Sequence, residues 1–145
     1  MSALPLPARP FSQPWADAFC DAINASVAYR ESARGWTWPL ALVLERAPEY
    51  GYAEDTAVVL DLDRGECRSA RVLPAAHADA PFAVRGPYDA WKAVARGALD
   101  PVAGIMLRRL TLVGPLATLL AHVQSARELV SCAARVETDF PDEKS

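Results

Sequence analysis

The sequence of 145 residues contains few of the residues from which metal, redox and nucleotide sites are built. It has three cysteines and two histidines, and Cys20, Cys67 and Cys132 are scattered without metal-ligand or redox spacing. Their odd number and wide separation indicate free thiols in a reducing compartment. The glycines of the second half of the chain have no spacing that fits a phosphate-cradling loop. The sequence therefore predicts no metal and no cofactor.

The sequence also lacks a basic block, a long hydrophobic run and a targeting signal. Lys and Arg number 15 against 18 Asp and Glu, which gives a net charge of −3, and Arg108 and Arg109 form a pair rather than a patch. This composition argues against nucleic-acid binding, since little is available to neutralise phosphates. The first residues show no secretory pattern, no stretch approaches the ~20 apolar residues of a membrane helix, and the final Glu143-Lys144-Ser145 differs from the peroxisomal S-K-L signal. We therefore expect a cytoplasmic protein.

What the sequence does have is a large apolar fraction. Hydrophobic residues make up 52% of the chain and charged residues 23%, a surplus that is compatible with an internal pocket. A chain of this length suits one domain, which buries roughly 68–70% of its unfolded surface. We expect that domain to cover 11–140. It follows an extended, proline-containing arm over 1–10, because proline blocks helix and sheet hydrogen bonds, and it precedes a polar, frayed tail over 141–145.

The spacing of apolar residues predicts an α+β chain. Trp15, Phe19, Ile23 and Val27 recur every four residues, which predicts a buried helix face within a helix over 13–31. Alternation predicts strands over 37–46, 57–63, 66–73 and 82–85, and a short apolar strand that ends at Gly114. A tight hairpin is predicted at 63–65. Further helices are predicted over 87–96, from Asp100-Pro101 onward, and over 115–135. This order of elements indicates helices packed mainly on one face of a sheet.

The segment from Tyr88 to Pro115, YDAWKAVARGALDPVAGIMLRRLTLVGP, carries the most informative motif. It has the order W, then G-x-L-D-P, then an apolar helix, then L-x-L-x-G. The residues that match this order are Trp91, Gly97, Leu99, Asp100, Pro101, Leu110, Leu112 and Gly114. The order resembles the signature half of the type-2 sterol carrier proteins, and a weaker likeness extends over 11–140. The chain departs from the family pattern at Arg108, Arg109, Val113 and Pro115.

The resemblance implies a single SCP-2-like domain with a mixed sheet of about five strands, helices mainly on one face and an apolar tunnel between them. It implies a stand-alone, bacterial-type module that binds a fatty acid, acyl-CoA, phospholipid or sterol-like molecule without catalysis. Transient membrane contact is compatible with such a cargo, and the oligomeric state is left open. The expected ligand-binding side chains are those of Trp38, Leu40, Leu42, Phe82, Trp91, Ile105, Met106, Leu110, Leu116, Leu119, Leu120 and Val123.

Two other functions stay open on the sequence alone. A small enzyme, such as a cyclase, isomerase or hydrolase acting on a hydrophobic intermediate, would need Asp61, Asp63 or His122 to face the pocket. Alternation places both aspartates on a solvated strand face, and His122 lies beside the apolar stripe of the last helix, so we expect surface or boundary positions for all three. A dimeric interaction protein would instead use apolar side chains such as Val59 and Val113 as its interface.

Overall fold

Residues 7–143, which the computed structural model describes, contain a five-stranded mixed sheet. Its strands are β1 (Leu40–Leu44), β2 (Thr56–Asp63), β3 (Glu66–Pro74), β4 (Phe82–Gly86) and β5 (Thr111–Val113). The strand order is β3-β2-β1-β4-β5, with β1 and β4 parallel and the other neighbours antiparallel. β1 is shorter than the predicted strand, because Pro39 has no N–H to donate to a sheet ladder.

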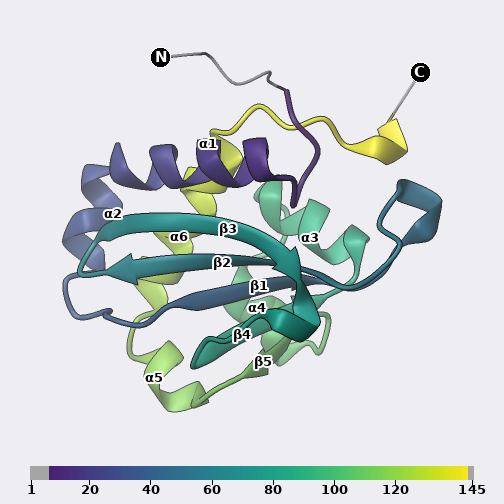
Figure 1. The fold of residues 1–145 in the computed structure, drawn as a ribbon. Coiled ribbons are helices and arrows are strands. Elements are labelled where there is room, and N and C mark those ends of the chain that lie inside the picture. The colour runs from purple at the N-terminus through teal and green to yellow at the C-terminus, as the bar shows by residue number, and fades with distance from the viewer. Residues whose placement is uncertain (1–6, 144–145) are drawn as a thin grey trace.

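The helices cover one face of this sheet (Figure 1). They are α1 (Gln13–Asn24), α2 (Val27–Ser32), α3 (Tyr88–Ala95), α4 (Pro101–Met106), α5 (Leu116–Leu120) and α6 (Val123–Ala134). Short 3₁₀ turns are η1 (Pro48–Tyr50), η2 (Ala75–His77) and η3 (Pro141–Glu143). The predicted α+β class, with a mixed sheet and helices on one side, is confirmed. None of the helices within residues 7–143 is long and apolar enough to cross a bilayer.

The hairpin between β2 and β3 forms as the sequence predicts. Asp63 pairs with Glu66 across a two-residue turn in which Arg64 has φ 51° and Gly65 has φ 92°. Positive φ at both central residues is the pattern of the turn whose twist matches that of paired strands. Gly65 also lies against α2, where an added Cβ would be 2.7 Å from the Cα of Arg30. The hairpin therefore fixes where α2 meets the sheet.

The predicted helix over 13–31 is two helices, because a serine begins the second one. The hydroxyl of Ser26 accepts a hydrogen bond from the N–H of Tyr29 at 3.0 Å and caps α2. Such a cap satisfies a helix N–H that would otherwise be unpaired, and it competes with continuation of α1. The break turns Val27 outward to 60% exposure, so its predicted place on the buried stripe is wrong, and Tyr29 is buried instead.

The predicted helix over 115–135 is likewise two helices, α5 and α6, with a break at His122. The His122 ring Nδ1 lies 2.8 Å from the Thr118 carbonyl oxygen, and the Ser125 hydroxyl donates to the His122 carbonyl at 2.8 Å. The His122 ring thus satisfies the Thr118 carbonyl, which the break leaves without its helical donor. The Ser125 hydroxyl adds a second bond to the His122 carbonyl, which also accepts the Ala126 N–H. The axis changes direction there, which takes α5 away from the line of α6 (Figure 1).

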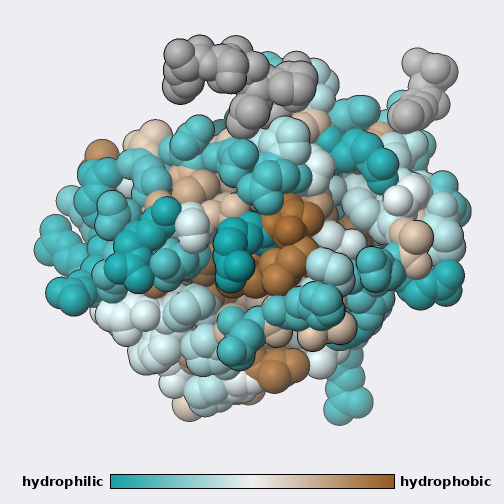
Figure 2. Space-filling model, in the orientation of Figure 1, coloured by the Kyte–Doolittle hydropathy of each residue, from teal (hydrophilic) through white to brown (hydrophobic). Residues whose placement is uncertain are grey.

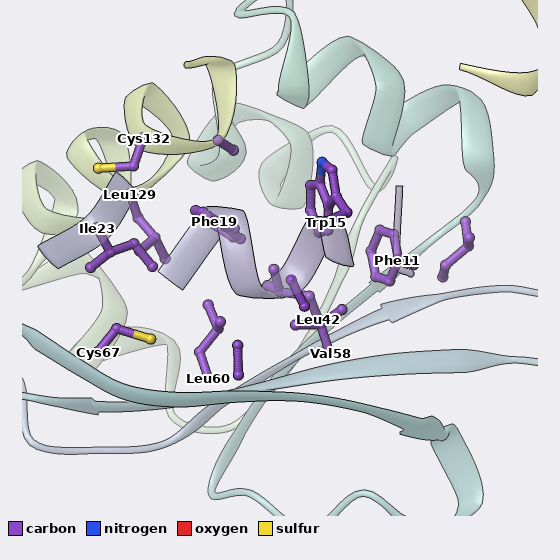
Figure 3. Packing of buried hydrophobic residues seen from close by; sticks show 14 of the residues in the cluster. Phe11, Trp15, Phe19, Ile23, Leu42, Val58, Leu60, Cys67, Leu129 and Cys132 are labelled. Atoms are coloured by element: carbon purple, nitrogen blue, oxygen red, sulfur yellow. The ribbon is translucent and has the colours of Figure 1, made fainter. Parts of the chain in front are cut away.

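The core lies between α1, α6 and the sheet (Figure 3). Trp15, Phe19 and Ile23 of α1 are buried at the predicted spacing, and they face Leu60 of the sheet and Leu129 of α6. Burying each large apolar side chain stabilises the fold by roughly 1.5–3 kcal/mol. A second, smaller cluster joins β4, α3 and the start of α4, and its buried members are Val84, Ala90, Val94, Leu99 and Leu110.

The two ends of the described chain pack on the domain. Ala8 is buried and forms a bridge with Thr138, although it belongs to the predicted arm, of which residues 1–6 lie outside the described residues. Near the other end, residues 141–143 of the predicted tail form η3. The Lys92 ammonium of α3 lies 2.7 Å from a carboxylate oxygen of each of Asp142 and Glu143. Residues 144–145 of the predicted tail also lie outside the described residues.

Candidate ligand-binding cavity

An apolar cavity of about 110 Å³ lies between the sheet and the helices. Its floor is one face of the sheet, where alternate residues point inward from β1 and β4. These floor residues are Leu40, Leu42, Leu44, Phe82 and Val84. β1 and β4 pair in parallel with Leu40 opposite Phe82 and Leu42 opposite Val84. Since side chains opposite each other point to the same face, this apolar strip is continuous across two strands.

The roof of the cavity comes from α3, α4, α5 and α6. Trp91 enters from α3, Ile105 from α4 and Leu119 from α5. The position of α4 is set locally, because the Asp100 carboxylate accepts the Ala103 N–H at 3.0 Å and caps the helix. Gly104 then lets α4 pack closely against Leu110, the residue before β5, since an added Cβ at Gly104 would lie 3.0 Å from the Leu110 side chain. The motif that the resemblance singled out therefore builds one wall of the cavity.

Aromatic rings form one side of the cavity. The Trp36 ring centroid lies 4.8 Å from that of Phe82 and 5.3 Å from that of His122, and all three residues line the cavity. Trp38 packs edge-on against Trp36 at 5.0 Å and accepts the Trp36 indole N–H at its carbonyl oxygen, 2.8 Å away. Trp36 therefore lies in the wall, and Trp38, which packs against the same Phe82 and His122 rings, lies outside it.

Most of the polar side chains in the wall are paired with other protein groups. The Trp15 indole donates to the Thr138 hydroxyl at 3.1 Å, and that hydroxyl donates to the Val136 carbonyl at 3.0 Å. The Ser125 hydroxyl is bound to the His122 carbonyl, as described above. Since the Thr118 carbonyl can only accept, Nδ1 of His122 carries a hydrogen, and in the neutral ring Nε2 is then an acceptor. The wall presents mainly hydrocarbon to the cavity.

A cluster of charged groups lies beside one part of the cavity wall. Lys92, the charged residue of the wall, is held by η3, whose Asp142 also accepts the Tyr88 hydroxyl. Hydrogen bonds from Lys92 lower the pKa of both Asp142 and Glu143, and the same bonds raise the pKa of Lys92. The three charges are thus retained at neutral pH, and the Lys92 ammonium lies 5.5 Å from the ring centroid of the buried Phe140.

The predicted ligand-binding residues divide into two groups. Seven line the cavity, namely Leu40, Leu42, Phe82, Trp91, Ile105, Leu110 and Leu119. Five lie outside its wall, namely Trp38, Met106, Leu116, Leu120 and Val123. Trp36 lines the cavity in place of Trp38. Met106 of α4 and Leu116 and Leu120 of α5 are exposed to solvent. Val123 begins α6, directly after the break at His122. Contact of any of the twelve with a ligand stays a prediction.

Several wall residues are not identified by the sequence patterns. The stripe of α1 predicts plain core for Trp15 and Phe19. Trp36 has the same alternation as Trp38 but precedes the predicted strand over 37–46, so the strand prediction leaves it out. The break at His122 also brings Ser125 and Leu129 of α6 to the cavity. The spacing of four residues in α1 does identify the buried face of the helix. It does not distinguish a side chain packed fully in the core from one that lines a cavity.

The residues of the two alternative functions lie in different places. Asp61 and Asp63 point away from the cavity and form ion pairs with Arg68 at 3.2 and 3.9 Å. His122 is half-buried and does line the cavity, but no carboxylate is present among the described wall residues to complete a Ser–His–acid site. The dimeric alternative needed Val59 and Val113 at the surface. Val59 is only 4% exposed and is not available to a partner, whereas Val113 is exposed.

The part of the chain that the structure describes has no group of three or more His, Cys, Asp or Glu side chains arranged to hold a metal. Lys92, the one charged residue among the described wall residues, is already paired with two carboxylates, and it therefore offers no free cation to a phosphate inside the cavity. The chemistry of the wall is that of a hydrocarbon-binding surface with a few polar groups at its edges.

Comparisons with known proteins agree with this architecture. Residues 18–126 match the SCP-2 sterol transfer family. A crystal structure of sterol carrier protein 2 is 37% identical, with 88% of this chain and 99% of that chain covered and a TM-score of 0.84. The solution structure of a conserved hypothetical protein from Thermus thermophilus, possibly a sterol carrier protein, is 36% identical, with 96% and 94% covered and a TM-score of 0.83.

More distant structures share the fold alone. The apo form of sterol carrier protein 2 from Yarrowia lipolytica is 14% identical, with 92% of this chain and 99% of that chain covered and a TM-score of 0.57. A search of curated proteins finds no match. The extent of the family match, together with two structures above 35% identity over most of the chain, leads to one conclusion: the chain belongs to the SCP-2 sterol transfer family.

Proposed function

We propose that this protein binds one hydrophobic molecule in the cavity and carries it without changing it chemically. The cargo belongs to the class of fatty acids, acyl-CoAs, phospholipids or sterol-like molecules. The observation that supports this most directly is the wall itself, which is apolar on the sheet side and the helix side. Family membership points the same way. The enzyme alternative has only His122 at the cavity and no acid beside it among the described wall residues.

The expected affinity follows from the size and chemistry of the site. Burial of an acyl chain contributes about 0.8 kcal/mol per methylene, so ten methylenes contribute roughly 8 kcal/mol. Association costs of about 4–15 kcal/mol offset much of this, so ten methylenes leave at most about 4 kcal/mol, an affinity near the millimolar range. An affinity near the micromolar range needs about five more buried methylenes, as in a long-chain lipid. Such a wall discriminates by volume and shape, at about 1–3 kcal/mol per methylene. We therefore expect binding to several related lipids.

The cavity must enlarge when a long ligand enters. Its volume of about 110 Å³ is below the roughly 300–1,000 Å³ of sites that enclose drug-sized ligands. The walls most easily displaced are α4 and α5, because each is a single short helix with one side exposed. The sheet floor is held by strand pairing on both sides of β1. Ligand entry is therefore expected to move these two helices and to leave the sheet in place.

The function is tested by titrating the delipidated protein with a fluorescent long-chain fatty acid and with a sterol, with native mass spectrometry to count bound molecules. One saturable adduct is expected. Leu119→Trp fills the cavity from α5 and is expected to weaken binding at least about tenfold, since the added ring occupies the ligand's space. The absence of saturable binding to every long-chain and polycyclic probe would refute the proposal.

The matched control is Leu116→Trp. It introduces the same ring on the same helix, three residues away, but at a side chain that lies outside the cavity wall. Binding within about twofold of wild type is expected. Equal loss in both variants would mean that disturbance of α5, and not filling of the cavity, weakens binding.

A further inference from the structure

The exposed large apolar side chains of this protein are concentrated in one stretch of the sequence. Met106 and Leu107 end α4, Val113 ends β5, and Leu116 and Leu120 lie on α5. Their exposed fractions are 62, 68, 59, 39 and 44%. Figure 2 shows apolar atoms at the surface where Figure 1 places β5. Together with Arg108 and Arg109, these residues are called the α4–α5 surface below. The chain runs through these residues without interruption from α4 through β5 to α5, and exposed apolar side chains that gather in one region are typical of interaction sites.

The two helices of this surface are apolar on both sides. Ile105 and Leu119 face the cavity, while their neighbours Met106 and Leu120 face solvent. α1 differs, because its exposed side carries a charged residue, Asp21. A helix that is apolar on every side is normally surrounded by protein or lipid and is not exposed to water. α5 in particular has the sequence LATLL, which contains no charged residue.

The charge of the same stretch is opposite in sign to that of the whole protein. Between Asp100 and Glu128 the sequence contains no acidic residue, although the net charge of the chain is −3. Arg127 is paired with Asp100 at 2.9 Å. Arg108 and Arg109 are exposed and take part in no ion pair among the described residues. Exposed arginines beside apolar side chains complement an anionic lipid interface, which offers phosphates above hydrocarbon.

The position of the surface also favours a lipid partner. α4 and α5 separate the cavity from this surface, since each helix has a wall residue on one side and exposed residues on the other. A molecule leaving a bilayer at this point passes from hydrocarbon to the cavity wall without crossing water. Because transfer of hydrocarbon through water is costly, this route lowers the barrier to exchange.

We propose that the α4–α5 surface docks the protein onto anionic membranes, with Met106, Leu107, Leu116 and Leu120 in the interface and Arg108 and Arg109 on lipid phosphates. This inference rests on the proposed function for its purpose, although the docking itself needs no cargo. The protein binds the surface of the bilayer and does not span it. Loading and unloading then occur where α4 and α5 meet the membrane.

The experiment is co-sedimentation of the ligand-stripped protein with vesicles of phosphatidylcholine, with or without about one-third phosphatidylserine. The wild type is expected to prefer the anionic vesicles and to lose affinity as salt rises, because the Debye length shortens. Arg108→Gln with Arg109→Gln is expected to weaken this binding about 10–30-fold. Arg34→Gln with Arg71→Gln removes the same charge elsewhere and is expected to change it less than about twofold.

A second pair of variants tests the apolar part. Leu107→Ser is expected to weaken binding about threefold to tenfold, because its burial in the interface is lost. Val27→Ser, at a similarly exposed valine on α2, is expected to leave binding unchanged. Thermal midpoints identify any variant that fails to fold. Equal binding to both vesicle types, or equal loss in the test and control variants, would overturn the docking surface.

The outcomes separate docking from cargo binding. Cargo is measured in solution without vesicles, and docking is measured on protein without cargo. Docking that fails in a protein that binds fatty acid overturns this inference alone. Docking that persists in a protein that binds no hydrophobic probe overturns the proposed function alone.

Discussion

At the scale of single residues, the structure brings two cysteines together that are 47 positions apart in the sequence. The Cys20 thiol lies 2.8 Å from the Cys67 thiol, and the first is half-exposed while the second is buried. Burial raises the pKa of both thiols above the usual value. Since the thiolate is the reactive form, both are poorly reactive at neutral pH despite their proximity.

We predict that a diazene oxidant such as diamide joins Cys20 to Cys67. The two thiols give up two protons and two electrons, the sulfur–sulfur bond forms, and the diazene is reduced to the hydrazine. Because the pKa of each thiol is raised, the rate is expected to increase about tenfold per pH unit from neutral pH upward. Mass spectrometry of peptides checks the pairing, and Cys67→Ser is expected to abolish it. A link to Cys132, or a rate independent of pH, would contradict the prediction.

At the scale of the element, the end of β5 depends on Gly114. Its φ is +128°, and an added Cβ would lie 2.9 Å from the Phe82 ring and 3.0 Å from the Pro81 carbonyl oxygen. Two properties of glycine are therefore needed at this position: it adopts a positive φ without strain, and it has no Cβ to collide with Phe82 and Pro81. The requirement links the last position of the family motif to the floor of the cavity, because Phe82 is one of the wall residues.

Gly114→Ala is predicted to lower the free energy of unfolding by about 2–4 kcal/mol, through backbone strain and overpacking together. Gly97→Ala is the control, since Gly97 also has positive φ, at +74°, but has open space around its Cβ position. It is expected to cost about 1–2 kcal/mol, because only the left-handed backbone is penalised there. Urea unfolding with unchanged slopes checks both values. Equal costs would show that the contact with Phe82 contributes nothing.

At the scale of the whole molecule, the cavity borders both hydrophobic clusters, so a bound ligand connects them. A ligand present at about 100 times its dissociation constant is predicted to raise the free energy of unfolding by about 2.7 kcal/mol. Hydrogen exchange is expected to slow most in α4 and α5, which enclose the ligand, and least in the hairpin of β2 and β3. Protection confined to that hairpin would place the ligand outside this cavity.

The architecture could be predicted from the sequence to a large extent, because it depends on short-range patterns. Alternation located the strands, and the two-residue turn at Arg64 and Gly65 located the hairpin. The Asp100 cap began α4 as predicted. The two helix breaks were missed, because each depends on a competition between helix continuation and a side-chain hydrogen bond to the backbone, from the Tyr29 N–H to Ser26 or from His122 to the Thr118 carbonyl. The outcome of that competition is decided by what the following helix packs against.

The sequence by itself determined the class of the protein, since the order of Trp91, Asp100, Leu110 and Gly114 identifies the family and sets the wall that α4 and β5 form. Only the tertiary structure decided which apolar side chains border the cavity. Trp36 and Trp38 have the same chemistry and both pack against Phe82 and His122, but Trp36 is buried and borders the cavity, whereas Trp38 is half-buried and lies outside its wall. The reason is physical: periodicity records which face of an element is turned inward, whereas a cavity exists where facing elements fail to fill the space between them.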